Sequence, residues 1–355
     1  SKAGQCGVWI RNTVNDVQTA YDTLADAIGT ENIRMFHSRY TMQDRQLHEN
    51  KVLEEFGKNS NGAKRAGKIL IATQVVEQSL DLDFDEMITD LCPIDLIMQR
   101  AGRLKRHVRD RCGNLIGGEE DERGVPVLHI YGPKAVENAT SRWYSDFFPG
   151  GAYVYNDPGI LWKTARILAR EKALVVPEKS RYLIEYVYGQ NGEAFPESLK
   201  ETSGFAQKTG IHSQAVAQSN VFPLFAGFIK PSDTNPWPDY SAPTRLADDA
   251  VVYRLCICEH SRLIPLAEDK QFPWQMSEVR YRKVTMEYDA GIRILIRETE
   301  KGLFDSGRGG IVLPMEKVSI GADQQKIYRS IGATNDGKSF FYDSILGLSL
   351  SSSGQ

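Results

Sequence analysis

The strongest indication of the fold is Lys68-Ile69-Leu70-Ile71-Ala72-Thr73-Gln74, which continues as VVEQSLDLD over residues 75–83. Ile69–Thr73 is apolar almost throughout, which is typical of a strand buried in a parallel sheet. Hydroxyl and amide side chains follow it directly, at the edge where α/β sheets bind their ligands. Around this strand, short apolar runs alternate with amphipathic stretches over residues 1–131. The alternation predicts an α/β fold in which helices cover a parallel sheet.

Further elements of this sheet follow from apolar runs, helix-capping residues and glycine stops. Asn12 or Thr13 begins a helix that stops at Gly29, and Thr41 with Asp44 opens a second helix that stops at Gly57. The expected strands are Gly7–Ile10, Ile33–His37, Ile69–Thr73, Met87–Leu91 and Val127–Tyr131, and the expected helices run to Ile28, to Phe56 and from Ile94 to Leu104.

Beyond residue 131 the pattern changes, first to looser helices and then to strands. Asp157 and Pro158 form a helix cap and first turn, Pro177 begins another helix, and the four prolines of Pro231–Pro243 are typical of a linker. We therefore expect an α/β lobe over residues 1–131, a helical linker region over 132–243 and a small β-rich C-terminal accessory domain over 244–355. Strands of the last part are expected at Ala250–Cys258, Arg262–Leu266, Val279–Tyr288 and Ile292–Arg297.

Composition excludes several classes of protein. Of the 355 residues, 41% are hydrophobic and 25% charged, which suits two or three ordinary globular domains. The longest apolar run, Val221–Ile229, is far shorter than the roughly 20 residues that cross a bilayer. The five cysteines are scattered and odd in number, as reduced thiols are, and no secretory leader pattern is visible. The sequence predicts a cytoplasmic protein.

One alternating group of metal-ligand residue types occurs near the C-terminal end of the chain. Cys256, Cys258 and His260 would share a face of one strand, so either a metal site or core packing is open. A structural zinc site normally needs four ligands, and no matching second pair is present. We expect core packing and no metal site.

A basic cluster stands out although the formal net charge of the chain is −3. Arg100, Arg103 and Arg106 recur every third residue, so a helix followed by a turn lines three guanidinium groups along one edge. A guanidinium donates two hydrogen bonds to phosphate oxygens and stabilises charge on a transferring phosphoryl group. The alternative is a solvated basic helix or a patch for a phosphate backbone. Arg109 and Arg111 are expected to lie outside this motif as ordinary basic residues.

Two further segments admit more than one interpretation. After the Ile69–Thr73 strand, Thr73 and Gln74 offer donors to a phosphate and Asp81 can accept from a ribose hydroxyl, or the hydroxyls merely cap the next turn. Gly332–Ser339 fits the P-loop pattern of nucleotide-binding proteins. Its context is wrong, however, because Asn335-Asp336-Gly337 is a hairpin-turn signal and Phe340-Phe341-Tyr342 favours a strand. We expect a hairpin there.

The order ATQVVEQSLDLDFD followed by QRAGRLKRH resembles motifs V and VI of superfamily 2 helicases. Upstream, Arg11-Asn12-Thr13-Val14 resembles motif IV, and FHSRYTMQDR, which contains Arg39, resembles motif IVa. The wording is most similar to the CRISPR-associated helicase-nuclease family of type I systems, nearest to its type I-E members. The resemblance covers residues 1–131 strongly, and less specifically the linker and the C-terminal Phe341-Tyr342-Asp343 with Leu346-Gly347-Leu348.

The resemblance implies a role for each matching residue. Arg103 and Arg106 would be arginine fingers acting on ATP, Gln99, Arg100 and Gly102 would face its phosphates, and Asp81 would lie near the ribose. Thr13, Arg39, Thr73 and Gln74 would contact single-stranded DNA. The fold implied is the second RecA-like lobe, followed by the family's linker and C-terminal domain.

The family's other parts have no match in this sequence. No P-loop in the required context, no DExH carboxylate pair and no His-Asp dipeptide of an HD nuclease occur. The resemblance therefore implies the C-terminal half of an ATP-dependent helicase-nuclease, inactive without the first lobe and the HD domain, with Mg²⁺ ligands on that missing lobe. The implied partners are single-stranded DNA and the crRNA-guided surveillance complex, Cascade. A non-catalytic docking or regulatory module, or a piece of another DExH helicase, remains the alternative.

Overall fold

The chain forms two compact units in the computed structural model, which describes residues 5–77, 80–118, 120–189, 193–219, 250–305, 310–320 and 326–352. The first unit comprises Ser1–His37 and Leu47–Thr209, and the second comprises Ser38–Gln46 and Gly210–Gln355. The expected linker Pro231–Pro243 lies outside the described residues. Within the described residues, no helix is both long and apolar enough to cross a membrane.

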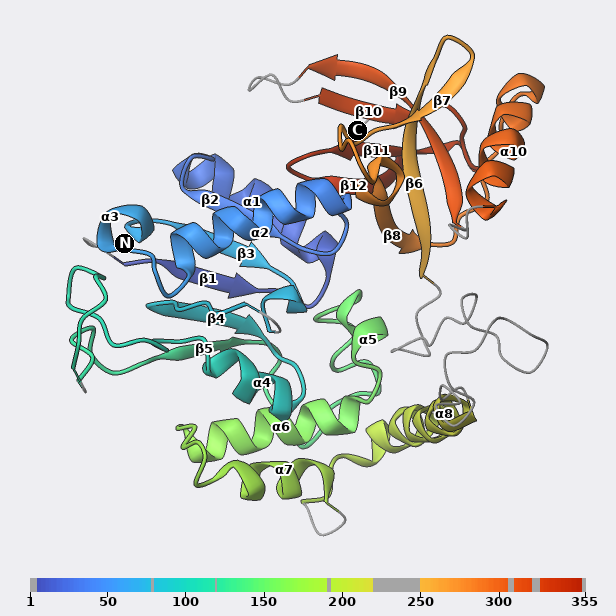
Figure 1. Cartoon of the computed structure of the whole chain (residues 1–355). Coiled ribbons are helices and arrows are strands. Elements are labelled where there is room, and N and C mark those ends of the chain that lie inside the picture. Colours follow the sequence, from blue (N-terminus) through green and yellow to red (C-terminus); the bar gives the residue numbers. More distant parts are fainter. Residues whose placement is uncertain are drawn as a thin grey trace, which may run out of the picture. The chain divides into compact units, whose positions relative to one another are not determined.

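A five-stranded parallel sheet forms the centre of the first unit (Figure 1). Its strand order is β2-β3-β1-β4-β5, so the central β1 lies between β3 and β4. The strands are β1 (Gly7–Ile10), β2 (Ile33–Phe36), β3 (Ile69–Ala72), β4 (Glu86–Asp90) and β5 (Leu128–Tyr131). All four strand pairings are parallel, which confirms the predicted α/β fold of the lobe and brings the carboxyl ends of the strands to one edge.

Helices connect these strands, and the two that were predicted from Thr13 and Thr41 begin at these capping residues. The helices are α1 (Val14–Ile28), α2 (Met42–Phe56), the short α3 (Gly62–Arg65) and α4 (Ile94–Ala101). The stretch up to Gly67, expected to be a loop, contains one short helix. Thr13 caps α1 by accepting a hydrogen bond from the Asp16 N–H at 3.1 Å. At the other end, Gly29 takes a φ of 79°, a left-handed conformation that favours glycine.

The first unit continues into residues that were expected to form a linker. This region contains α5 (Gly151–Val154), α6 (Pro158–Glu171), α7 (Ser180–Tyr188) and α8 (Lys200–Ser219), with 3-10 turns at Gln74–Val76 and Glu197–Leu199 in the same unit. As predicted, Asp157 caps α6 and Pro158 occupies its first turn. Ile94 of α4 packs in one core cluster with Ile167, Leu183 and Val187 of α6 and α7. This shared apolar core joins α6 and α7 to the first unit, which ends at Thr209, within α8.

A seven-stranded sheet forms the centre of the second unit, in the order β12-β11-β10-β9-β6-β7 with β8 paired to β6. Its members are β6 (Ala250–Glu259), β7 (Arg262–Pro265), β8 (Glu278–Arg282), β9 (Ile311–Ile320), β10 (Lys326–Ser330), β11 (Lys338–Asp343) and β12 (Gly347–Ser352), with helices α9 (Pro273–Met276) and α10 (Ala290–Asp305). All pairings are antiparallel except β6 with β9. The expected β-rich C-terminal part is confirmed.

The segment Ser38–Gln46 is held within the second unit by the C-terminal strands. The Arg39 carbonyl accepts from the Leu348 N–H at 2.7 Å. The Tyr40 hydroxyl donates to the Ile345 carbonyl at 2.8 Å. The Tyr342 hydroxyl accepts from the Thr41 N–H at 3.1 Å and also bonds to the Asp44 carboxylate.

Two expected strands of the second unit were wrong in type or length. Residues 292–297, predicted as a strand, lie inside α10. Their apolar residues also recur at helical spacing, and the Asp289 carboxylate accepts from the Ile292 N–H at 2.9 Å in the first turn. Leu295 and Ile296 then pack beside buried Cys256. The strand expected to reach Tyr288 ends at Arg282.

The P-loop pattern at Gly332–Ser339 forms the turn between β10 and β11, as predicted. The Thr334 N–H donates to the Lys338 carbonyl at 2.8 Å, and Gly337 has a φ of 76°. The Lys338 ammonium pairs with Asp336 at 2.6 Å. Antiparallel strands flank the turn, so it lacks the helix N-terminus that a phosphate-binding P-loop requires. The core packing expected of Cys256, Cys258 and His260 is confirmed for Cys256, which is fully buried, but is wrong for Cys258 and His260, which are exposed at and beyond the end of β6.

Candidate functional site

Candidate residues of the first unit lie at the carboxyl ends of its parallel strands and on a turn beside the residues that precede β4. Asn12 and Thr13 follow β1, Thr73 and Gln74 follow β3, and Leu91 follows β4. The arginine-rich segment lies on α4 and the turn after it. That turn runs beside residues 82–84, because the Phe84 N–H donates to the Arg103 carbonyl at 2.9 Å and the Lys105 N–H donates to the Phe84 carbonyl at 2.8 Å.

Arg100 is fully buried and joins three parts of the lobe. Its Nε donates to the Glu77 carboxylate at 2.8 Å, and its Nη1 donates to the Thr89 hydroxyl at 2.6 Å and the Asp90 carbonyl at 3.2 Å. Its Nη2 donates to the Tyr155 hydroxyl at 3.3 Å. A buried guanidinium needs such partners, since an unpaired buried charge is costly. The structure therefore turns Arg100 towards Glu77, where it supports the segment after β3, and its expected contact with phosphate does not fit this placement.

Arg103 and Arg106 lie closer to solvent, on the same turn. The Arg103 Nη2 donates to the Glu77 carbonyl at 2.9 Å. The pKa of Arg103 is lowered mainly by burial and, to a smaller extent, by the charge of Arg106. The Arg106 side chain is 43% exposed, and its Nε lies 2.8 Å from the Asp81 carboxylate. Gln99 and Gly102, predicted to face the phosphates, are also exposed. The two predicted finger residues are thus held against the segment after β3 while remaining accessible.

Asp81 is the acidic residue that faces this turn. Its Oδ1 accepts from Arg106 and lies 2.9 Å from the His107 Nε2. Partial burial raises the pKa of Asp81, but the hydrogen bonds and charges of His107 and Arg106 outweigh that effect and lower it overall. Asp81 is therefore ionised at neutral pH and paired with the arginine turn.

The predicted strand contacts occupy different environments. Thr13 is engaged as the cap of α1, where its hydroxyl also donates to the Asp16 carboxylate at 2.6 Å. Thr73 is only 3% exposed and its side chain makes no capping hydrogen bond. The Gln74 Nε2 donates to the Asn12 carbonyl at 3.0 Å and to the Tyr155 hydroxyl at 3.2 Å. Thr73 and Gln74 thus lie at the same sheet edge as Asn12.

Arg39 belongs to the second unit and is described separately. Its guanidinium carbon lies 4.8 Å from the centre of the Tyr281 ring, a cation–π geometry. Burial lowers the pKa of Arg39. The strand contact expected of this arginine stays a prediction.

Asp90 anchors the segment after β1 and is fully buried. Its Oδ2 accepts from the Arg11 Nε at 2.9 Å and from the Asn12 N–H at 3.1 Å. Burial raises the pKa of Asp90, and the Arg11 charge with its hydrogen bond opposes the rise. The side chain of Arg11 also stacks on Trp9, with 4.4 Å from the guanidinium carbon to the ring centre. These contacts fix the backbone that carries Asn12 and Thr13.

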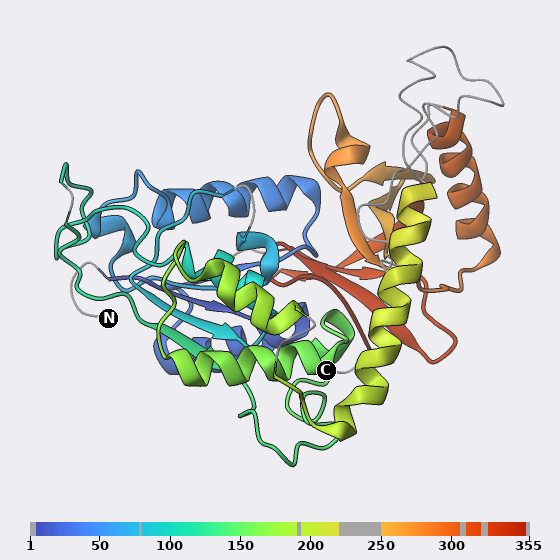
Figure 2. The same cartoon turned by 90° about the horizontal axis from the view of Figure 1, so that it is seen from below.

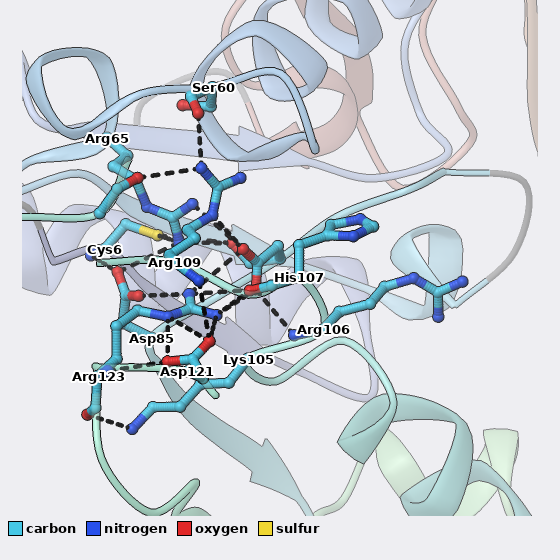
Figure 3. Close-up of polar contacts among 12 residues, drawn as sticks. Cys6, Ser60, Arg65, Asp85, Lys105, Arg106, His107, Arg109, Asp121 and Arg123 are labelled. Atoms are coloured by element: carbon cyan, nitrogen blue, oxygen red, sulfur yellow. Dashed lines mark hydrogen bonds and ion pairs between the residues drawn. The ribbon is translucent and has the colours of Figure 1, made fainter. Parts of the chain in front are cut away.

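A buried ion network, shown in Figure 3, stands behind the arginine turn. Arg65 and Arg123 converge on Asp85, at 3.2 Å and 2.7 Å, and Arg123 also pairs with Asp121 at 2.6 Å. The third carboxylate of the network, Asp83, is fully buried and bonds to Arg109 and Arg123. Each of the three carboxylates is thus paired with arginine. The Asp83 Oδ1 also accepts from the Arg106 N–H at 2.9 Å. The network therefore fixes the backbone at Arg106.

The environment of Arg109 differs from the one expected from the sequence. This arginine was expected to be an ordinary basic residue outside the motif, but it is fully buried in this network. Its guanidinium donates to Asp83 and to the carbonyls of Gly57, Lys58, Ser60 and Gly113. Arg111 is exposed, as expected. A basic run in sequence does not distinguish a solvated arginine from one that meets a buried carboxylate far away along the chain.

Two tyrosines at the site were missed by the sequence analysis. The Tyr144 hydroxyl donates to the Leu91 carbonyl and accepts from the Asn12 Nδ2, both at 2.9 Å. Tyr155 contacts Gln74 and Arg100. Both come from the region expected to be a linker, and no local spacing marks them. The acidic pair Asp83 and Asp85 carried a weak signal, since each stands beside an apolar residue that must be buried.

Comparisons with known proteins agree with this geometry. Residues 3–109 match the family described as CRISPR-associated nuclease/helicase Cas3, C-terminal. The CRISPR-associated endonuclease/helicase Cas3 of Escherichia coli K12 is 49% identical over 191 residues, and that of Thermus thermophilus is 40% identical over 168 residues. The alignments cover 53% and 47% of this chain but 19% and 16% of those relatives. The chain thus matches under a fifth of their length.

Solved structures show the same fold. A crystal structure of T. fusca Cas3 superposes with a TM-score of 0.69 at 22% identity, covering 98% of this chain and 38% of that one. A T. fusca structure described as Cas3-ATP gives a TM-score of 0.67. A chain of a CRISPR RNA-guided surveillance complex, described as pre-nicking, gives 0.62 at 21% identity. The RecA-like α/β fold is confirmed, and the matches agree with the expected resemblance to the C-terminal portion of this family.

Proposed function

We propose, from the premise that this chain carries the C-terminal region of the CRISPR-associated nuclease/helicase family, that it supplies the second lobe of an ATP-driven translocase on single-stranded DNA. The observation that supports this most directly is the joining of the arginine turn to the segment after β3. Arg103 donates to the Glu77 carbonyl, and Arg106 pairs with Asp81. The segment after β3 thus links the candidate strand-binding residues at the carboxyl edge of the sheet to the candidate finger residues, whose turn lies beside the residues that precede β4.

Arg106 and Arg103 would act as arginine fingers on the γ-phosphate of ATP. A guanidinium stabilises the charge that develops when the phosphoryl group is transferred. Pairing with Asp81 does not prevent this, because ion pairs between exposed side chains contribute only about 0–1 kcal/mol. Arg106 can therefore exchange Asp81 for a phosphate at little cost. Exposed Gln99 and Gly102 would line the phosphate side, and Asp81 would then lie near the ribose.

Mg²⁺ does not fit the donors of the described residues. No group of three or more His, Cys, Asp or Glu side chains in those parts of the chain could hold an ion, and the carboxylates behind the arginine turn are neutralised by arginines. We therefore place the metal ligands, together with the rest of the ATP site, on a first RecA-like lobe.

The strand would pass over the carboxyl edge of the sheet. Thr13, Thr73 and Gln74 lie there and would contact its backbone, with Arg39 as a further predicted contact from the second unit. Phosphate contacts position a strand without reading its sequence. In a two-lobe protein with an HD nuclease domain, the strand would be DNA displaced by the crRNA-guided surveillance complex, as in type I CRISPR interference.

This chain by itself is expected to show neither ATPase nor nuclease activity. A lobe with fingers but without a metal and phosphate cradle cannot hold ATP for hydrolysis. The measurement is steady-state phosphate release with and without single-stranded DNA, using the Lys338→Ala variant as a comparison. DNA-stimulated turnover that is lost in Lys338→Ala would contradict both the hairpin interpretation of Gly332–Ser339 and the proposal that the rest of the ATP site lies on a first lobe.

Thr73→Val is expected to weaken binding of single-stranded DNA by about 1 kcal/mol, or roughly fivefold, since it removes one neutral hydrogen-bond donor and keeps the shape. The loss should be equal for oligonucleotides of different sequence. Fluorescence anisotropy in a two-lobe protein measures it, with Thr23→Val on the exposed side of α1 as the matched control. Unchanged affinity in Thr73→Val would show that this covered hydroxyl does not contact the strand.

A further inference from the structure

Tyr155 lies at the end of α5 and touches both halves of the proposed site. Its hydroxyl accepts from the Gln74 Nε2 at 3.2 Å and from the Arg100 Nη2 at 3.3 Å. Gln74 belongs to the strand-binding segment after β3, whereas Arg100 lies on α4, which leads to the arginine turn. One hydroxyl oxygen therefore bridges a residue that would contact DNA and a residue that supports the fingers.

The α5 segment is placed firmly enough to act on the site. Figures 1 and 2 show α5 (green) at the end of the first unit's sheet to which β1 and β4 point. A Cβ on Gly150 would stand 3.1 Å from the Thr13 methyl group, so the backbone approaches the residues after β1 closely. Buried Tyr144 anchors the same segment through Asn12 and the Leu91 carbonyl. These contacts hold the segment that carries Tyr155 in a fixed position at the site.

The side-chain amide of Gln74 can bind a phosphate only by giving up one of its present hydrogen bonds, and the bond to Tyr155 is a candidate. An amide nitrogen carries two hydrogens, and those of Gln74 are directed at the Asn12 carbonyl and the Tyr155 hydroxyl. Neither N–H can reach a phosphate oxygen unless one of these bonds is given up. The bond to Tyr155 is the longer of the two. Release of Gln74 would leave Tyr155 bonded to Arg100 alone, and Arg100 is bound to Glu77.

We propose that Tyr155 is a positioning residue that couples strand binding at Gln74 to the placement of the arginine turn through Arg100 and Glu77. The inference rests on the proposed function. When Gln74 turns to the DNA backbone, Tyr155 loses one of its two donors. Its position relative to Arg100 then differs between the strand-free and strand-bound states. Such a two-state contact links two binding events by a coupling free energy.

The coupling is measured in a two-lobe protein that contains this chain, as the ratio of the dissociation constants for single-stranded DNA without and with a non-hydrolysable ATP analogue. Tyr155→Phe removes the bridging oxygen and keeps the ring. We expect it to reduce this ratio by about fivefold or more, towards 1. Tyr153→Phe is the matched control, because Tyr153 stands in the same short helix and is 91% exposed. It is expected to keep the wild-type ratio.

The outcomes separate the inference from the function on which it rests. A wild-type ratio in Tyr155→Phe, or an equal loss in Tyr153→Phe, would overturn the role of Tyr155 while strand binding stands. A wild-type protein that binds no single-stranded DNA would overturn the proposed function, and the inference with it. Thermal unfolding of both variants checks their folds, and a normal transition with a reduced ratio supports coupling over a structural role.

Discussion

Arg106→Ala in a two-lobe protein that contains this chain is expected to lower the maximal rate of ATP hydrolysis by roughly 10³-fold or more. The guanidinium would act on charge that appears only in the transition state, so the affinity for ATP should change much less than the rate. The backbone N–H of Arg106 is fixed by Asp83 at 2.9 Å, and this bond does not depend on the side chain. The alanine variant should therefore keep the turn in place.

Steady-state kinetics with saturating single-stranded DNA give the maximal rate, and binding of a fluorescent ATP analogue gives the affinity. Arg181→Ala is a suitable control, because that arginine is exposed on α7 of the same unit and pairs with nearby Glu185. Wild-type turnover in Arg106→Ala would remove it from the proposed fingers. Arg106→Lys tests geometry, since it keeps the charge and loses the two-pronged contact with phosphate.

Arg103→Ala should lower turnover similarly but carries a second effect. Its Nη2 holds the Glu77 carbonyl, so truncation also frees the segment after β3. We therefore expect Arg103→Ala to weaken DNA binding as well, whereas Arg106→Ala should not. The same anisotropy measurement separates the two variants.

Arg109→Ala is expected to destabilise the first unit by about 3 to 5 kcal/mol, because removing one partner leaves buried charge uncompensated. Arg109 is fully buried, pairs with Asp83 and donates to four backbone carbonyls. These carbonyls lose their donor at the same time, which adds to the cost. Thermal and urea unfolding of this chain measure the effect.

Arg111→Ala provides the matched control, since Arg111 is exposed two residues further along the same loop. It is expected to change stability by no more than about 0.5 kcal/mol. Equal stability of the two variants would show that the ion network contributes nothing to the fold. Arg109→Met separates lost volume from lost charge, because methionine refills much of the space without pairing with Asp83.

Local sequence signals predicted the five strands and the longer helices of residues 1–131. Buried parallel strands read as short apolar runs, and capping residues such as Thr13 and Asp157 act on the next turn, so both signals are local. The same locality explains the mistake at residues 292–297. Their isoleucines satisfy a strand period and a helix period together, and the choice depends on what they pack against.

Which charged and polar groups meet depends on the tertiary structure. Arg100, Arg106 and Arg109 belong to one basic run, yet one is buried against Glu77, one is exposed beside Asp81 and one is buried against Asp83. Tyr155 reaches Gln74 from a segment 81 residues away along the chain. Such pairs form because desolvated charges and hydroxyls must find partners wherever the fold brings them. Because these partners are far apart in the sequence, no periodicity marks them. The candidate site could therefore be predicted from residue types, whereas the contacts between its residues could not.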